Sequence, residues 1–262
     1  LRAWTVGLAL TLVGLVAPAP AVAQTPVLPA IPLTIWSAPP GSVLDGIGSW
    51  LATGNDPTAG IGQAQADYAY FHEFYFANSQ SFGDISMLTF GGEKFVELRV
   101  FDEEEGRLHR VRVQFPWQAG RFYFPFVYRL ASGVWAGYVF DNTAGVWTTV
   151  GSVLVPARLL KLTAESATGV AWAGPELASC GAFPLADVYR MAPTGNIGGV
   201  SVASTVIERT EVPGDCPASA VSSSPGFERY RVGSTPPPIA GALSGPRASR
   251  SPSDGRRYTT AG

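Results

Sequence analysis

Apolar and polar residues alternate along two neighbouring stretches of the chain, residues 94–102 and 107–115. In the first stretch Val96, Leu98 and Val100 alternate with charged residues, and the second stretch shows the same two-residue period. A period of two is typical of a β-strand with one buried and one exposed face. The acidic turn at 103–106 joins the stretches. We therefore predict a β-hairpin with an apolar face and a face of opposite charges that pair across the strands.

Residues 115–130, FPWQAGRFYFPFVYRL, contain seven aromatic residues and two prolines. With a period of two, Phe122, Phe124, Phe126 and Tyr128 share one face of a strand, and we predict that this face is core. Pro125 has no N–H to donate to a neighbouring strand, so we expect the strand to lie at a sheet edge or to be bulged there.

The rest of the chain predicts further short strands and no helix of three turns. Residues 133–141 and 146–156 read as a second hairpin, and aromatic and β-branched runs begin near residue 66. Residues 156–166 are at most a short helix. Residues 24–60 are a turn-rich N-terminal segment. Several short strands without helical periodicity predict an all-β fold, an antiparallel β-sandwich or jelly roll over residues 61–232.

The two ends differ from the body in composition. Residues 1–23 have one basic residue, an apolar run and a small-residue cleavage site, the pattern of a signal peptide; the alternative, a membrane anchor, requires a longer apolar run. Residues 233–262 are rich in Pro, Gly, Ser and Arg, so we predict a disordered tail. We therefore expect a secreted, extracellular protein with no membrane span after cleavage.

Charge and cysteine content narrow the function. The body between the two ends has 13 basic and 19 acidic residues, which argues against nucleic acid as a partner because such proteins need a basic face. Cys180 and Cys216 are the only cysteines. Outside the cell we expect them to form a disulfide. The oligomeric state stays open.

A larger pattern resembles a known family. Residues 115–156 resemble the core of the bacterial family called domain of unknown function 3472. The matching positions are Trp117, Gly120, Tyr123, Trp135, Tyr138, Asp141, Gly145, Trp147, Gly151, Ser152 and Pro156. This resemblance implies a secreted bacterial protein with a concanavalin-like or jelly-roll sandwich, often found near carbohydrate-active modules. It implies no activity, because the family is uncharacterised.

The titratable residues give little support for an enzyme. The chain has neither a G-x-S-x-G nor an H-E-x-x-H motif. His72 is interpreted as an ordinary strand residue. The carboxylates at 102–105 precede a glycine, so a solvated hairpin tip explains them better than a catalytic pair. We identify no catalytic residue, and a polysaccharide-active hydrolase or lyase with an unidentified carboxylate pair is kept as an alternative.

A calcium site is the one candidate for a cofactor. Asp141 and Asn142 begin the turn of the second hairpin and supply oxygen ligands suited to Ca²⁺. A turn whose backbone is capped by Asp141 explains the same residues better, because calcium needs six or more oxygens. We therefore expect no cofactor.

Binding of an extracellular polysaccharide is our leading prediction. Sugars stack on exposed aromatic rings while polar groups nearby bond their hydroxyls. The candidate ligand-binding residues are Trp117, Arg121, Tyr123, Trp135 and Trp147. Each tryptophan is by itself more commonly a core residue. A structural or interaction domain without a small ligand is the third alternative.

Overall fold

The computed structural model describes residues 26–56, 67–77, 79–217, 219–224 and 226–233. The predicted signal peptide at 1–23 and, apart from Gly233, the predicted tail at 233–262 lie outside these residues. The described chain is almost entirely strand, with one short 3-10 helix at Cys180–Ala182. Within these residues, no helix has the length and apolar character needed to cross a membrane.

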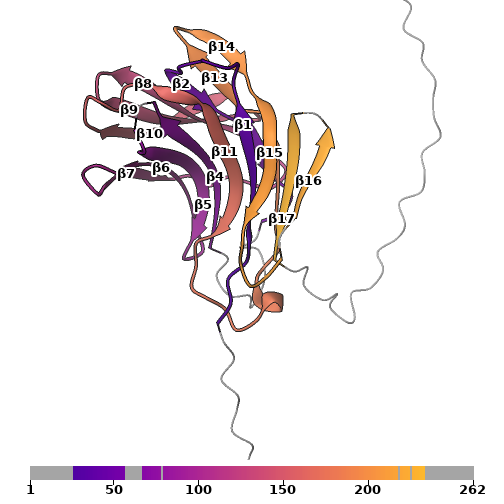
Figure 1. The fold of residues 1–262 in the computed structure, drawn as a ribbon. Coiled ribbons are helices and arrows are strands. Elements are labelled where there is room, and N and C mark those ends of the chain that lie inside the picture. The colour runs from indigo at the N-terminus through magenta and orange to yellow at the C-terminus, as the bar shows by residue number, and fades with distance from the viewer. Residues whose placement is uncertain (1–25, 57–66, 78, 218, 225, 234–262) are drawn as a thin grey trace, which may run out of the picture.

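The first sheet has seven antiparallel strands among the described residues (Figure 1). Their order is β15 (Thr205–Val212), β1 (Ile31–Ser37), β11 (Leu162–Trp172), β4 (Tyr68–Phe76), β5 (Phe82–Phe90), β6 (Glu93–Asp102) and β7 (Arg107–Gln114). The pairings of β15 with β1, β1 with β11 and β11 with β4 join segments far apart in the sequence, whereas β4 to β7 pair in sequence order.

The second sheet has ten strands among the described residues and branches at β8 (Phe122–Ala131). One side of β8 pairs with β9 (Val134–Asp141), which pairs with β10 (Val146–Leu154). The other side pairs with β2 (Gly46–Gly48) and, further along, with β3 (Leu51–Thr53). From β2 the sheet continues to β13 (Thr194–Ile197) and β14 (Val200–Ala203); from β3 it continues to β12 (Ala186–Met191), β17 (Phe227–Val232) and β16 (Ser219–Ser224).

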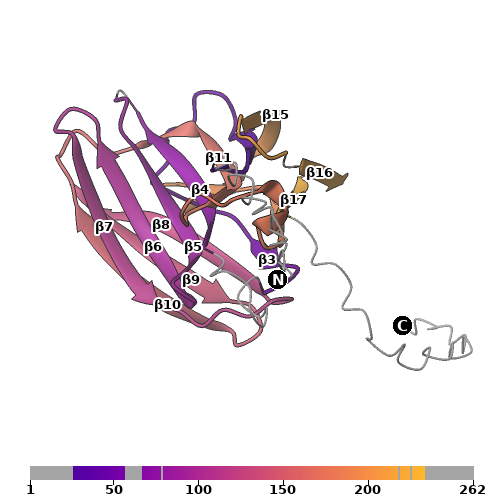
Figure 2. The same ribbon diagram turned by 90° about the horizontal axis from the view of Figure 1, so that it is seen from below.

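The two sheets form a sandwich whose core lies between them. Figure 2 shows the layers from below, with β4 to β7 over β8 to β10. The core contains large aromatic side chains from both sheets, among them Tyr70, Phe74, Tyr123 and Trp135. The predicted all-β, antiparallel sandwich is therefore confirmed.

Both predicted hairpins are present. β6 and β7 pair along their length. On the charged face, Arg112 Nε donates a hydrogen bond to Glu97 Oε2 at 2.5 Å. β9 and β10 pair from Asp141 and Val146 onward. The proposed short helix after residue 156 is wrong, because Leu162 onward forms β11 between β1 and β4.

Two further expectations need correction. The turn-rich segment 24–60 contributes β1, β2 and β3 to the sandwich instead of preceding it. β8 is an interior strand with no bulge at Pro125, which pairs with Val139 of β9. On the other side Pro125 lies opposite the break between β2 and β3, because their paired residues on β8 are Phe126 and Tyr123. No strand there needs the N–H that proline lacks.

Candidate functional site

The outer face of the ten-stranded sheet carries a continuous group of aromatic side chains, which we call the aromatic face. Its members are Trp50, Phe124, Phe126, Tyr128, Tyr138, Phe140 and Trp147. Trp147 is 55% exposed and the other six are half-buried. Because apolar surface in contact with water is costly, a group of this size on a surface marks a place of interaction.

The prediction that this face of β8 is core is wrong. Tyr123, Pro125 and Val127 point into the sandwich, and Phe124, Phe126 and Tyr128 point outward. Both faces of the strand are apolar. The two-residue period therefore predicts a strand but does not show which of its faces is buried. Aromatic character does not identify the buried face here, because the outward set contains two phenylalanines and a tyrosine.

Two glycines of β2 make room for the rings of the aromatic face. Added Cβ atoms would lie 2.8 Å from the ring of Tyr128 at Gly46 and 2.9 Å from that of Phe124 at Gly48. Phe126 lies between these two rings, at centroid distances of 5.8 and 6.0 Å and interplanar angles of 17° and 19°. The glycines therefore let three nearly parallel rings pack against the bare backbone of β2.

Trp147 stands at the margin of the aromatic face. The register places it opposite Phe140, which is itself opposite Phe124 on β8. The indole lies 5.1 Å from the Phe140 ring and 6.3 Å from the Phe124 ring. A row of aromatic residues thus crosses three strands and ends in an exposed indole.

Of the five predicted ligand-binding residues, Trp117, Tyr123 and Trp135 are at most 2% exposed. Each holds the core together: Trp117 packs edge-on against Tyr70, Tyr123 accepts a hydrogen bond from a backbone N–H, and the Trp135 indole donates to a backbone carbonyl at 2.8 Å. Their rings face the sandwich interior and offer no surface to a sugar. This corrects the prediction for these three residues.

The other two predicted residues lie near the surface. Trp147 belongs to the aromatic face. Arg121 is part-exposed, and its guanidinium lies 3.9 Å from the carboxylate of Asp141. The sequence prediction missed the remaining members of the aromatic face, although their two-residue spacing on β8 and β9 was visible.

The predicted calcium ligand Asp141 caps a turn. Its Oδ1 accepts the backbone N–H groups of Thr143 and Ala144 at 2.8 and 3.0 Å, and Gly145 follows with φ of 69°. A turn capped by Asp141 was the alternative to a calcium site, and the structure has this capped turn. The neighbouring Asn142 is exposed. The carboxylate is thus engaged by the backbone of its own turn.

A different acidic group lies at the tip of the β6–β7 hairpin. Within the described residues, Asp102, Glu105 and His109 place their ligand atoms within 4.8 Å of one another. Arg158 already neutralises this group, with Nη2 at 2.5 and 2.6 Å from the two oxygens of Asp102. A guanidinium held there competes directly with a metal ion.

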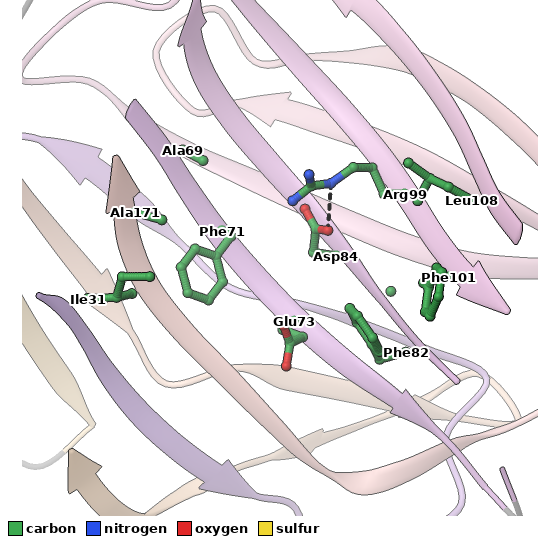
Figure 3. Close-up of a pocket in the computed structure, with 11 residues that line it drawn as sticks. Ile31, Ala69, Phe71, Glu73, Phe82, Asp84, Arg99, Phe101, Leu108 and Ala171 are labelled. Carbon is green, nitrogen blue, oxygen red and sulfur yellow. Dashed lines mark hydrogen bonds and ion pairs between the residues drawn. The ribbon is translucent and has the colours of Figure 1, made fainter. Parts of the chain in front are cut away.

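The outer face of the seven-stranded sheet holds a second candidate site, a pocket of about 340 Å³ (Figure 3). Its walls are mainly apolar, and Glu73 and Asp84 lie on its floor beside Arg99. The lining residues are Ile31, Ala69, Phe71, Glu73, Phe82, Gly83, Asp84, Arg99, Phe101, Leu108 and Ala171. We call it the acidic pocket.

Glu73 and Asp84 are direct neighbours across β4 and β5, and Arg99 is the next residue in the same row on β6. Asp84 accepts hydrogen bonds from Arg99 Nε at 2.8 Å and from Ser86 Oγ at 2.5 Å. Burial raises the pKa of Asp84 more than these partners lower it. Burial likewise raises the pKa of Glu73, with the charge of Asp84 adding to the effect.

The acidic pocket therefore contains two adjacent carboxyl groups that hold protons more strongly than usual. Such groups are suited to donate a proton to a bound substrate in mildly acid solution. The spacing of carboxylates along one strand or in one turn does not predict this pair, because the two residues are eleven positions apart and meet only through strand register.

The predicted disulfide is confirmed. Cys180 and Cys216 are joined with a Cα–Cα distance of 5.3 Å. The disulfide links the 3-10 helix to the segment after β15. The backbone of this segment also bonds the segment before β1, where Ala30 N donates to the carbonyl oxygen of Cys216.

Comparisons with known proteins assign the chain to no family. No family model and no curated protein matches the chain, so the resemblance to the uncharacterised family stays a prediction. A crystal structure of Scytalido-glutamic peptidase with a peptide-based transition state analogue covers 78% of this chain and 98% of its own, with 13% identity and a TM-score of 0.49. SCP-B, a member of the eqolisin family of peptidases, gives the same values in a complex with the tripeptide Ala-Ile-His.

A lectin is also among the similar structures. Lectin UEA-II in complex with galactose covers 78% of this chain and 71% of its own, with 10% identity and a TM-score of 0.25. The antiparallel β-sandwich and its disulfide are shown by the strand pairings and by the Cys180–Cys216 bond of this chain itself.

Proposed function

We propose that the protein is a binding protein that holds a polysaccharide chain across its aromatic face, outside the cell. The single observation that carries this proposal is the group of seven part-exposed aromatic side chains ending in Trp147. Aromatic rings present apolar planes that match the C–H faces of sugar rings.

The geometry of the aromatic face supports an extended ligand. The rings occupy β8, β9 and β10 as well as Trp50 before β3, so the face runs across strands. The hydroxyl groups of Tyr128 and Tyr138 lie on the same face and can bond sugar hydroxyls. Rings spread over three strands can stack against several sugar units at once, which suits a long chain.

The proposed location is supported by the disulfide. Disulfides persist in oxidising surroundings such as the cell exterior and are rare where thiols are kept reduced. The Cys180–Cys216 bond fits secretion, which the predicted signal peptide also requires.

The test is a binding assay of the full chain with insoluble cellulose, chitin, xylan and peptidoglycan, followed by a glycan array. Trp147→Ala should weaken binding at least tenfold, about 1.4 kcal/mol, because the exposed indole is lost and little packing is disturbed. Phe90→Ala is the matched control, since Phe90 is 51% exposed and lies on the outer face of the other sheet. Retention of no polysaccharide, or equal binding by the Trp147 variant and the wild type, would overturn the proposal.

A second candidate function is hydrolysis in the acidic pocket. The adjacent carboxyl groups of Glu73 and Asp84 favour it, because glycoside hydrolysis needs two carboxyl groups about 5 to 9.5 Å apart. Release of reducing ends from the same polysaccharides near pH 5 is the measurement. Loss of that release in Glu73→Gln, with full release in Glu208→Gln, supports hydrolysis; no release by the wild type refutes it.

A further inference from the structure

A group of polar side chains lies between the two sheets, apart from both the aromatic face and the acidic pocket. Arg190 of β12 and His72 of β4 are both fully buried in this layer. Ionised side chains are almost never found in a protein interior without a partner of opposite charge. A buried Arg190 is therefore expected to have a partner of opposite charge.

Arg190 has few hydrogen-bond partners. Its Nη1 donates to Ser49 Oγ at 3.0 Å. Within the described part of the chain, its Nε and Nη2 have no hydrogen-bond partner. Burial lowers the pKa of Arg190 to about 10, so the guanidinium keeps its positive charge at neutral pH.

The acidic residue that faces Arg190 across the strands is engaged elsewhere. Glu228 of β17 is opposite Arg190 in the strand register and is fully buried. Both of its oxygens accept from Arg209, at 3.0 Å from Nε and 2.6 Å from Nη2. Arg209 is 41% exposed, so Glu228 forms its ion pair toward the surface, and the guanidinium of Arg190 bonds Ser49 in place of a carboxylate.

The other titratable groups of this layer do not supply a negative charge. Burial raises the pKa of Tyr230, so its hydroxyl stays protonated and bonds Thr168 Oγ1 at 2.8 Å. Burial and the charge of Arg190 lower the pKa of His72 to about 3, so the imidazole is neutral. Thr168, which is opposite His72 in the register, bonds Tyr230, and Tyr230 lies two residues from the Glu228 that faces Arg190.

Other polar atoms of the layer also lack partners. Among the described residues, neither ring nitrogen of His72 has a hydrogen-bond partner, and Ser166 Oγ has none. His72 is opposite Thr168 in the register, but the Thr168 hydroxyl already bonds Trp36 Nε1 and Tyr230. The layer therefore contains several buried polar groups without partners beside a guanidinium that no described carboxylate bonds.

We propose that this layer holds a small monovalent inorganic anion, with chloride as the natural candidate, bound by Arg190 Nε and Nη2 and by an N–H of His72. A water molecule would satisfy the donors without placing a negative charge beside the guanidinium, whereas an anion does both.

The test measures thermal unfolding of the full chain in sodium chloride, bromide and nitrate against sodium gluconate at equal ionic strength. Binding to the native state alone should raise Tm by about 5 to 10 °C when the anion is one hundredfold above its Kd. Gluconate, a much larger organic anion, is the reference salt and should give no such rise. Equal behaviour in all four salts would overturn the proposal.

Variants locate the effect. Arg190→Met removes the charge and keeps a long side chain, and replacing a buried ion by an apolar residue is commonly tolerated; it should abolish the halide response. Arg229→Met is the matched control on the outer face of β17, where Arg229 pairs with Asp187, and should keep the response. Arg209→Met frees Glu228 for Arg190 and should also reduce it.

A crystal grown in bromide gives a readout that does not depend on variant stability. An anomalous peak beside Arg190 Nε and Nη2 is the expected result. A peak only at surface sites, or a water molecule bonded to Arg190 in place of the ion, would refute the anion. If Arg190→Met fails to fold, the salt series and this peak decide the question.

Discussion

Asp45 ties three distant segments together, and its removal gives the sharpest prediction for stability. The side chain is 10% exposed and lies 2.6 Å from Arg129 Nη2 of β8 and 2.5 Å from Lys161 Nζ before β11. Its Oδ2 also accepts the backbone N–H of Gly198 at 3.2 Å. One carboxylate thus joins the β1–β2 connection to both sheets.

The magnitude follows from the pKa of Asp45. Burial alone would raise it, but the hydrogen bonds from Lys161, Arg129 and Gly198 outweigh burial and lower it from 3.8 to about 2. A difference of that size corresponds to about 2 kcal/mol of folding free energy. Because both cations are part-exposed and screened by solvent, we expect about 1 to 2 kcal/mol.

The sign of the pH dependence is fixed by the lowered pKa. The stabilisation is fully present above about pH 4 and is lost as the pH falls through 4 toward 2. Urea unfolding should show Asp45→Asn less stable than wild type by about 1 to 2 kcal/mol at pH 7. The difference should shrink between pH 4 and pH 2.

Two results would refute this reasoning. One is a difference between wild type and Asp45→Asn that stays constant from pH 7 to pH 2. The other is an equal loss in Glu93→Gln, the control at an exposed carboxylate. Addition of 1 M salt should reduce the effect only in part, because the carboxylate itself is buried.

Three further changes are testable by urea unfolding. Gly48→Ala should cost about 1 to 3 kcal/mol, because its Cβ would lie 2.6 Å from a backbone carbonyl oxygen, whereas Gly181→Ala, with nothing within 4 Å, should cost little; equal costs would contradict the packing argument. Replacing both Cys180 and Cys216 by Ser should cost about 3 to 4 kcal/mol, since the bond joins residues separated by 36 positions, and the same stability with and without reductant would contradict it. Trp135→Phe should cost about 2 to 3 kcal/mol through a void and an unpaired buried carbonyl; a loss below about 0.5 kcal/mol, typical of surface changes, would show that the indole hydrogen bond contributes nothing.

The sequence by itself determined the local structure where one face of a strand is clearly polar. Val96, Leu98 and Val100 alternate with charged residues, and the β6–β7 hairpin formed as expected, with the charged face outward. The turn at Asp141 was also predictable, because a side-chain cap and a glycine with positive φ are local features. The pairing of Cys180 with Cys216 followed from there being only two cysteines.

Tertiary structure decided everything that depends on which residues meet across strands. In β8 both faces are apolar, so only packing against the seven-stranded sheet could select Tyr123 and Val127 for the core and leave Phe124 outside. Glu73 and Asp84 became neighbours only through the register of β4 with β5. The alternation of apolar and polar residues is a property of one strand. Which face of a strand is buried, and which residues are neighbours across strands, depends on the whole sandwich. The candidate sites consist of residues that meet across strands, so only the tertiary structure could reveal them.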